Sequence, residues 1–235
     1  MPPDSNFKPN ILCFSGWAQN ASALEPLLTP VTHNFQISSF DYLKFSDIDD
    51  LFAGLKDSVG NPDIIIGWSL GGQIALRLIS QKIFKPQRLI LISTPILPAK
   101  SALFEHLKDN LNNNSQKVAG KLLALMVKDD GSARNNIRNN LYLKLSSNNQ
   151  QFLSFWLEEL ESFNSNNLDF TGLPETLIIH GDNDLVIDVN NSKLLAEKIA
   201  NCKLELFNSC GHLPFIHDFQ RTQKLIIQYI NELYI

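Results

Sequence analysis

The chain alternates short apolar runs with segments in which apolar residues recur every three or four positions. The short runs are bounded by turn residues, which is typical of strands buried on both faces of a sheet. Six such runs lie at 10–14, 35–40, 64–66, 88–92, 176–180 and 203–207. The periodic segments predict helices near 21–28, 48–55, 70–79, 192–200 and 225–233. Strands that alternate with helices predict an α/β fold with a mostly parallel, doubly wound sheet.

The alternation of strands and helices stops after Pro95 and returns only after Phe170. The intervening segment has helical apolar spacing and several asparagine-rich joints, but no run that is typical of a strand. We therefore expect residues 1–98 and 171–235 to form the α/β core. Residues 99–170 are expected to form a helical lid, inserted after the fourth predicted strand.

Composition narrows the classes of protein that this chain can be. Its 235 residues are 44% hydrophobic, which suits one large domain with a sizeable core. The formal net charge of −4 argues against general nucleic-acid binding, and no apolar run is long enough for a membrane span. The first residues lack the pattern of a signal peptide. The odd count of three cysteines then indicates free thiols and a cytoplasmic protein.

One strand runs directly into a Gly-x-Ser-x-Gly motif, and a helical pattern follows at once. Ile64–Ile66 precede Gly67-Trp68-Ser69-Leu70-Gly71. This order of strand, sharp turn and helix is the one that a nucleophile elbow needs, because the turn lifts the serine hydroxyl clear of the sheet. The carboxyl ends of parallel strands share one edge of the sheet, so other strand-end loops are expected to lie beside Ser69.

Two such loops carry a candidate acid and a candidate base for the serine. A serine hydroxyl needs a base, and the base needs an acid that orients it. The order of these groups along the chain, serine first, then the acid, then the histidine, resembles that of the α/β-hydrolase superfamily. That resemblance implies that Ser69, Asp184 and His212 form the triad. Asp182 competes with Asp184, which the Gly-x-x-Asp-x-x-Val pattern of the superfamily favours, with Ile187 at the valine position in this chain. His180 ends a strand ahead of this loop, so we expect a structural role for it.

Hydrolysis also needs donors for the oxyanion, and these are backbone N–H groups. The residue after the nucleophile, Leu70, supplies one, and Trp17 in the loop after the first strand supplies the other. Many superfamily members carry His-Gly in that loop, whereas this chain has Ser15-Gly16. The donor is a backbone group, so this departure leaves the oxyanion hole intact. The histidines are scattered in the sequence and a serine triad needs no metal, so no metal or other cofactor is expected.

The chain resembles one family within the superfamily more closely, the pimeloyl-[acyl-carrier protein] methyl ester esterases of biotin synthesis. The motifs that carry this resemblance are Ser15-Gly16-Trp17 with Asn20, Gly67-Trp68-Ser69-Leu70-Gly71-Gly72 and His212-Leu213-Pro214-Phe215-Ile216. The resemblance implies that the enzyme hydrolyses the methyl ester of pimeloyl-acyl-carrier protein and releases methanol. The expected walls of the acyl cleft are Trp17, Trp68, Leu123 and Phe215.

The predicted lid is basic, although the whole chain is acidic. Residues 100–144 hold eight lysines and arginines against four acidic residues. Two pairs of cations, Lys117 with Lys121 and Arg134 with Arg138, are spaced four apart, which places each pair on one face of a helix. The resembling family uses two arginine pairs at this spacing to hold the acidic carrier protein. The first pair here is lysine, which lacks the bidentate fork of arginine.

Two alternatives to a carrier-dependent esterase stay open. The chain could be a carboxylesterase or thioesterase for small free esters, which would use the same triad without a carrier partner. It could also be a binding protein on a hydrolase scaffold, although the complete set of serine, acid and histidine argues against this. In each case we expect a monomer that binds neither nucleic acid nor membrane.

Overall fold

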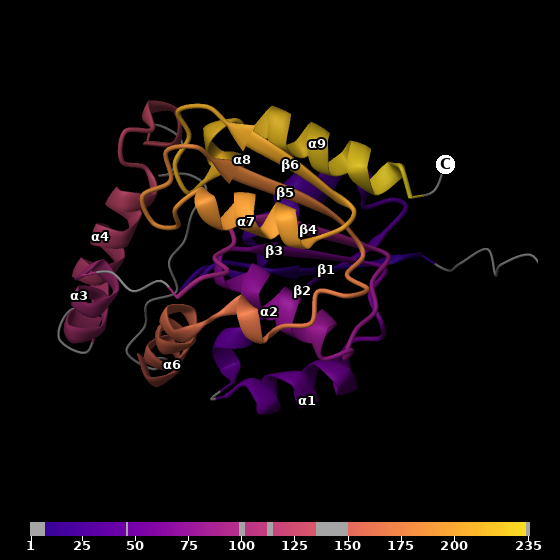
Figure 1. The fold of residues 1–235 in the computed structure, drawn as a ribbon, viewed down its shortest axis with the longest axis horizontal. Helices are drawn as coiled ribbons and strands as arrows, with labels where there is room; N and C mark the ends of the chain where they lie inside the picture. Colours follow the sequence, from indigo (N-terminus) through magenta and orange to yellow (C-terminus); the bar gives the residue numbers. More distant parts are fainter. Residues whose placement is uncertain (1–7, 46, 99–101, 112–114, 135–149, 234–235) are drawn as a thin grey trace, which may run out of the picture.

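The computed structural model describes the chain except for residues 1–7, 46, 99–101, 112–114, 135–149 and 234–235. Its centre is a six-stranded sheet in the order β2-β1-β3-β4-β5-β6, and every neighbouring pair is parallel. This arrangement confirms the predicted parallel, doubly wound sheet (Figure 1). The strands are β1 (Asn10–Phe14), β2 (Gln36–Ser39), β3 (Ile64–Trp68), β4 (Arg88–Ile92), β5 (Glu175–Gly181) and β6 (Cys202–Phe207).

The order of the strands reverses between β1 and β3, which lie side by side in the sheet. In open α/β sheets, ligands bind at such a switch point, beyond the carboxyl ends of the strands. Every residue of β3 and of β4 is buried, as expected for central strands covered on both faces. The backbone N–H of Ser69 donates to the carbonyl of Ile92 over 2.8 Å and so fixes the end of β3 against β4.

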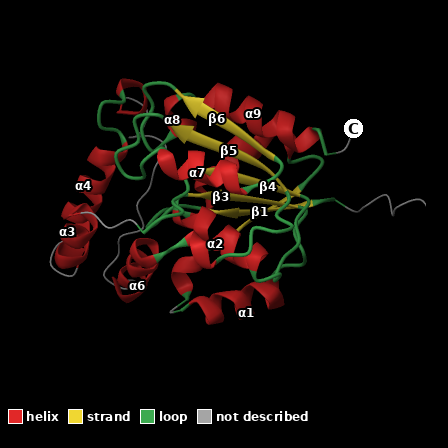
Figure 2. Ribbon diagram, in the orientation of Figure 1, coloured by secondary structure: helices red, strands yellow, loops and turns green. Residues whose placement is uncertain are grey.

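Helices cover both faces of the sheet (Figure 2). Right-handed crossovers that run in opposite directions along the sheet place their helices on opposite faces. The connection from β1 to β2 therefore lies on one face, where η1 contacts α9, and α2 lies on the other, against β1 and β3. The helices that flank the core are η1 (Ala21–Val31), η2 (Tyr42–Lys44), α1 (Ile48–Ser58), α2 (Leu70–Ser80), α7 (Asn190–Lys198), α8 (Pro214–His217) and α9 (Phe219–Asn231).

The first of these helices differs from the sequence prediction. A helix was expected to end ahead of Pro30, but η1 is a 3-10 helix that includes both Pro26 and Pro30. Proline lacks the N–H that an α-helix needs and its ring clashes with the preceding turn. The tighter 3-10 form accommodates both prolines in short turns.

The described part of the segment between β4 and β5 is mostly helical, and it lies beyond the carboxyl ends of the strands (Figure 1). No described helix, here or elsewhere in the molecule, is long and apolar enough to cross a membrane. Whether this segment moves as a lid stays a prediction. Its described elements are α3 (Ala102–Leu111), α4 (Ser115–Met126), α6 (Gln150–Ser162) and η4 (Ser165–Asn167).

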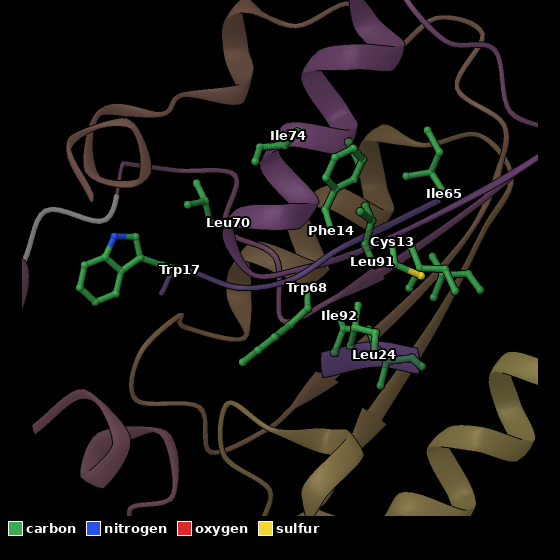
Figure 3. Packing of buried hydrophobic residues seen from close by; sticks show 14 of the residues in the cluster. Cys13, Phe14, Trp17, Leu24, Ile65, Trp68, Leu70, Ile74, Leu91 and Ile92 are labelled. Carbon is green, nitrogen blue, oxygen red and sulfur yellow. The ribbon is translucent and has the colours of Figure 1, made fainter. Parts of the chain in front are cut away.

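The hydrophobic core fills the space between the sheet and its helices. Phe14, Ile65 and Leu91 from three adjacent strands are fully buried, and Leu70 and Ile74 of α2 pack in the same cluster (Figure 3). All three cysteines are free thiols, as expected. The core thus holds the base of α2 rigidly beneath the serine turn.

Candidate active site

Ser69 lies in a strained turn between β3 and α2. Its backbone angles are φ 54° and ψ −120°, a conformation that non-glycine residues adopt only where the surroundings enforce it. The flanking glycines allow the close approach of strand and helix. A Cβ atom at Gly67 would lie 2.6 Å from the carbonyl oxygen of Gly71, and one at Gly71 would lie 2.2 Å from that of Phe14. The turn therefore has the geometry expected of a nucleophile elbow.

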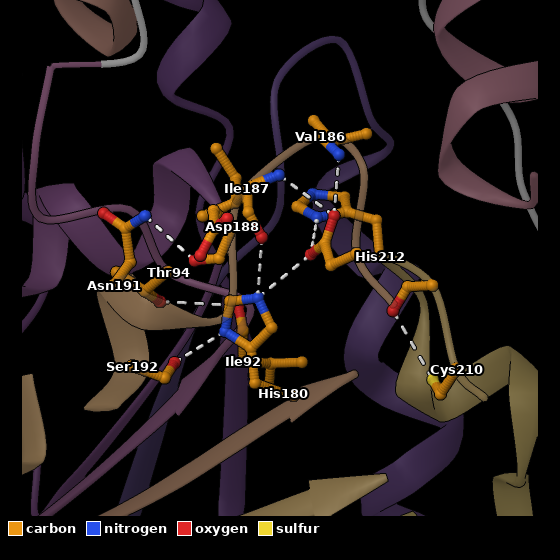
Figure 4. A network of polar contacts seen from close by, with 12 residues as sticks. Ile92, Thr94, His180, Val186, Ile187, Asp188, Asn191, Ser192, Cys210 and His212 are labelled. Carbon is orange, nitrogen blue, oxygen red and sulfur yellow. Dashed lines mark hydrogen bonds and ion pairs between the residues drawn. The ribbon is translucent and has the colours of Figure 1, made fainter. Parts of the chain in front are cut away.

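Asp184 and His212 meet at the same edge of the sheet, from the loops that follow β5 and β6. His212 Nδ1 lies 2.7 Å from Asp184 Oδ2, and both side chains are fully buried. The other carboxylate oxygen, Oδ1, accepts the backbone N–H groups of Val186 at 2.8 Å and Ile187 at 2.9 Å. Figure 4 shows His212, Val186 and Ile187 around this network. The competing residue Asp182 is exposed.

The surroundings of Asp184 keep its carboxyl group ionised. Burial alone would raise the pKa, but the charge of His212 and the hydrogen bonds from His180 and His212 outweigh burial. The pKa of Asp184 is therefore held well below its ordinary value. An ionised carboxylate at Nδ1 holds the imidazole in the tautomer whose Nε2 can accept a proton, and it stabilises the imidazolium that then forms.

His212 Nε2 is buried and has no hydrogen-bond partner among the described residues. The His212 ring lies beside the indole of Trp68, which precedes the serine, with 5.9 Å between the ring centroids. No hydrogen bond joins Ser69 to His212 in the described part of the chain. Such bonds are often long before substrate binds, and they tighten in the complex with substrate.

The two predicted oxyanion donors also lie at strand ends. Leu70 is the first residue of α2, so its N–H has no acceptor within the helix. Trp17 lies in the loop that follows β1. The backbone N–H groups of Trp17 and Leu70 donate no hydrogen bond to any described residue. The hydroxyl of Tyr42 donates to the carbonyl of Gly16 over 2.6 Å, and the Trp17 indole donates to the carbonyl of Leu153 over 2.9 Å. These two bonds hold the loop that would present the Trp17 N–H.

The other residues singled out by the sequence are placed only in part. The rings of Trp68 and Phe215 pack edge to face, with centroids 5.0 Å apart, and Leu123 is partly buried on α4. Lys121 and Arg134 are exposed. Lys117 lies in α4, but its side chain is not described, and Arg138 lies outside the described residues. A common face for the four cations therefore stays a prediction.

One residue in direct contact with the candidate triad was not predicted as part of the site. His180 was expected to be structural, but its Nε2 lies 3.1 Å from Asp184 Oδ2, the oxygen that His212 also contacts. The sequence offers a weak signal for this contact. His180 is the next-to-last residue of β5, four residues ahead of Asp184, and only the bend of the intervening loop turns the two side chains toward each other.

A buried carboxylate from the segment between β4 and β5 contacts the loop that carries His212. Asp130 Oδ2 accepts the N–H of Gly211 at 3.0 Å, and Oδ1 accepts the N–H of Ala133 and lies 2.8 Å from His217 Nδ1. The side chains of Asp130, Cys210 and His217 each offer an atom of a kind that binds metals, and these atoms lie within 4.8 Å of one another. The sequence pattern did not predict this cluster. The hydrogen bonds to both oxygens account for the burial of Asp130 without a metal.

Comparisons with known proteins point to one family. A family model described as Hydrolase_4, serine aminopeptidase, S33, matches residues 30–218. Pimeloyl-[acyl-carrier protein] methyl ester esterase of Nitrosomonas europaea is 23% identical over 229 residues, covering 88% of this chain and 90% of that protein. Monoacylglycerol lipase ABHD6 of Homo sapiens is 38% identical over 92 residues, which are 39% of this chain and 25% of that protein. The structure of an esterase from Exiguobacterium antarcticum superposes with a TM-score of 0.76 at 17% identity, over 95% of this chain and 92% of that one.

Proposed function

The chain belongs to the Hydrolase_4 family (serine aminopeptidase, S33) and has the α/β-hydrolase fold, and on that premise we propose that it is a serine carboxylesterase. Ser69 is the nucleophile, His212 the general base and Asp184 the acid that orients the base. The observation that carries this proposal is the 2.7 Å contact between His212 Nδ1 and Asp184 Oδ2, combined with the free Nε2 of the same ring.

The proposed reaction proceeds in two stages that use the same groups. Ser69 Oγ attacks the ester carbonyl carbon while His212 Nε2 takes its proton, and the N–H groups of Trp17 and Leu70 stabilise the oxyanion. Collapse of the intermediate breaks the bond to the alcohol, which leaves with the proton from His212. Water then attacks the acyl-enzyme and gives one proton to His212. The second intermediate collapses, the bond between the acyl carbon and Ser69 Oγ breaks, and Oγ takes that proton back from His212 as the acid leaves.

We propose further that the ester is the methyl ester of pimeloyl-acyl-carrier protein, so that the leaving alcohol is methanol. The Nitrosomonas europaea relative is named for this activity and matches nearly the whole chain. The exposed cations Lys121 and Arg134 lie on the segment between β4 and β5, beyond the strand ends that carry the site. Positive charge there would steer an acidic carrier protein toward Ser69. The proposed enzyme works as a cytoplasmic monomer.

The esterase activity is tested with Ser69→Ala and a fluorophosphonate probe. The unaltered chain should hydrolyse p-nitrophenyl butyrate and be labelled once at Ser69, whereas Ser69→Ala should lose both properties. Absence of turnover and labelling in the unaltered, folded chain would instead favour a binding protein on a hydrolase scaffold. Complementation of a biotin-requiring strain that lacks this esterase, by the unaltered chain but not by Ser69→Ala, tests the role in biotin synthesis.

The carrier partner is tested by reversing one exposed charge. Arg134→Glu should lower kcat/KM for the carrier-linked methyl ester about tenfold, and turnover of p-nitrophenyl butyrate should stay within about twofold. Lys56→Glu is a matched control, because Lys56 is an exposed cation on α1, away from α4 (Figure 1). Equal carrier-linked turnover in both variants would contradict the carrier proposal. It would favour a small-ester carboxylesterase, a class to which the local match with the monoacylglycerol lipase also points.

A further inference from the structure

His180 is a fully buried histidine whose two ring nitrogens both have partners. Nδ1 lies 2.6 Å from the hydroxyl of Ser192 in α7. Nε2 lies 2.9 Å from the carbonyl oxygen of Ile187 and 3.1 Å from Asp184 Oδ2. Figure 4 shows His180 between Ser192 on one side and Ile187 on the other. The proposed reaction uses none of these groups except Asp184.

The partners of His180 fix the position of its proton. A carbonyl oxygen and a carboxylate can only accept hydrogen bonds, so Nε2, which faces both of them, must carry the hydrogen. In the neutral ring Nδ1 is then an acceptor, and the Ser192 hydroxyl donates to it. Ser192 thereby holds the ring in the tautomer and the orientation that point Nε2–H at Ile187 and Asp184.

The contact with Asp184 completes the set of donors around that carboxylate. Oδ1 accepts two backbone N–H groups, from Val186 and Ile187, and Oδ2 faces the rings of His180 and His212. A carboxylate held at both oxygens cannot rotate away from its histidine. We propose that His180, held by Ser192, is a positioning residue of the triad that fixes Asp184 Oδ2 for His212. This inference rests on the proposed role of Asp184 as the triad acid.

Loss of the His180 donor has two consequences that a loss of packing does not share. Oδ2 would keep only the hydrogen bond with His212, so its negative charge would act more strongly on that ring. The protonated ring would be stabilised, and the acid limb of the kcat/KM profile would move to higher pH. The carboxylate would also be free to turn, which lowers kcat. The titratable groups around Asp184 and His212 in the described structure include His180 from β5, Cys210 from the loop after β6, and Asp130, which accepts the N–H of Gly211.

The test compares kcat/KM for p-nitrophenyl butyrate across pH in five variants of the full chain. His180→Leu removes the donor and should lower kcat/KM about tenfold to a hundredfold, with the acid limb at higher pH. His180→Gln can place an amide N–H where Nε2 lies, and it should recover most of the rate and the original acid limb. Ser192→Ala leaves the ring without its anchor and should fall between the two.

Leu195→Ala is the matched control for packing. Leu195 is fully buried on α7, the helix that carries Ser192, and it has no polar atom in its side chain. The Leu195→Ala variant should unfold at a lower denaturant concentration, and the acid limb of its kcat/KM profile should stay at the original pH. If His180→Leu does not fold, the kcat/KM profiles of His180→Gln and Ser192→Ala across pH test the inference instead.

The inference is overturned if the His180 and Ser192 variants lose stability as Leu195→Ala does, with no movement of the acid limb. It is also overturned if His180→Gln is as slow as His180→Leu. Asp184→Asn separates this failure from that of the proposed function. Nearly full activity in Asp184→Asn would refute the role of the acid itself, whereas inactivity of Asp184→Asn beside normal His180 variants would refute only the positioning role.

Discussion

Asp184→Asn gives the sharpest single test of the proposed triad, because the structure dictates how the new amide must sit. An asparagine here has one oxygen and one NH2 group in place of two carboxylate oxygens. If the oxygen keeps the N–H groups of Val186 and Ile187, the NH2 faces His212 Nδ1. His212 Nδ1 must then accept a hydrogen bond, so Nε2 carries the proton and cannot take one from Ser69.

The opposite orientation of the amide would restore the productive tautomer, but at a cost in hydrogen bonds. It would set the NH2 group against the N–H groups of Val186 and Ile187, which then have no acceptor. The first orientation sets the NH2 group against the Nε2–H of His180, but that donor keeps the carbonyl oxygen of Ile187. Leaving these two backbone donors unpaired, one buried and one partly buried, costs about 1–3 kcal/mol each, or about 2–6 kcal/mol together. At 1.36 kcal/mol for each factor of ten, this range corresponds to a fall in kcat/KM of about 30-fold to 10⁴-fold. The wrong tautomer therefore dominates, and most of the activity is lost.

The assay is kcat/KM for p-nitrophenyl butyrate, measured beside labelling of Ser69 by a fluorophosphonate. Asp182→Asn is the matched control, since this residue lies two positions earlier in the same loop and is exposed. Its activity should stay within about twofold of the unaltered enzyme. A loss of less than tenfold in Asp184→Asn, or an equal loss in Asp182→Asn, would refute the assignment of the acid.

Three other perturbations test the groups that surround Ser69 and His212. The folded pKa of Asp184 lies below its ordinary value, so its charge contributes stability that is lost as the pH falls below about 4. In urea titrations below about pH 4, the free energy of unfolding should fall more steeply with decreasing pH for the unaltered chain than for Asp184→Asn. Gly71→Ala would place a Cβ atom 2.2 Å from the carbonyl oxygen that ends β1, and it should lower the free energy of unfolding by about 3 kcal/mol. An unchanged urea midpoint would contradict that close approach. Tyr42→Phe removes the 2.6 Å hydrogen bond to Gly16 that holds the loop with the Trp17 N–H, and it should lower kcat about tenfold with little change in KM. A kcat equal to that of the unaltered enzyme would show that this loop needs no such anchor.

The sheet and the serine turn could be predicted because their signals are local. Short apolar runs that are rich in β-branched residues and bounded by turn residues are too short for most helices, so they favour buried strands. Gly67 and Gly71 are required where strand and helix touch. The loops of Asp184 and His212 could be placed because each follows a predicted strand. Parallel topology then brings such loops to a common edge without any knowledge of side-chain packing.

Contacts that depend on loop shape or on distant segments could not be predicted in this way. Four positions separate His180 from Asp184 outside any helix, and that spacing does not say that their side chains meet. Asp130 and Gly211 are brought together only by the packing of the segment between β4 and β5 against the core. The 3-10 form of η1 depends on how two prolines are accommodated, which helical periodicity does not report.

The position of His212 is set from two independent directions. Its side chain is held by Asp184, which belongs to the α/β core, whereas its backbone N–H donates to the carbonyl of Met126 at the end of α4 over 3.1 Å. Asp130 adds a second bond to the preceding residue, Gly211, where a Cβ atom would lie 2.5 Å from the Met126 oxygen. The described part of the segment between β4 and β5 therefore supports the proposed base directly. Substitutions in the last turn of α4 should change the rate through His212, even where they contact no substrate.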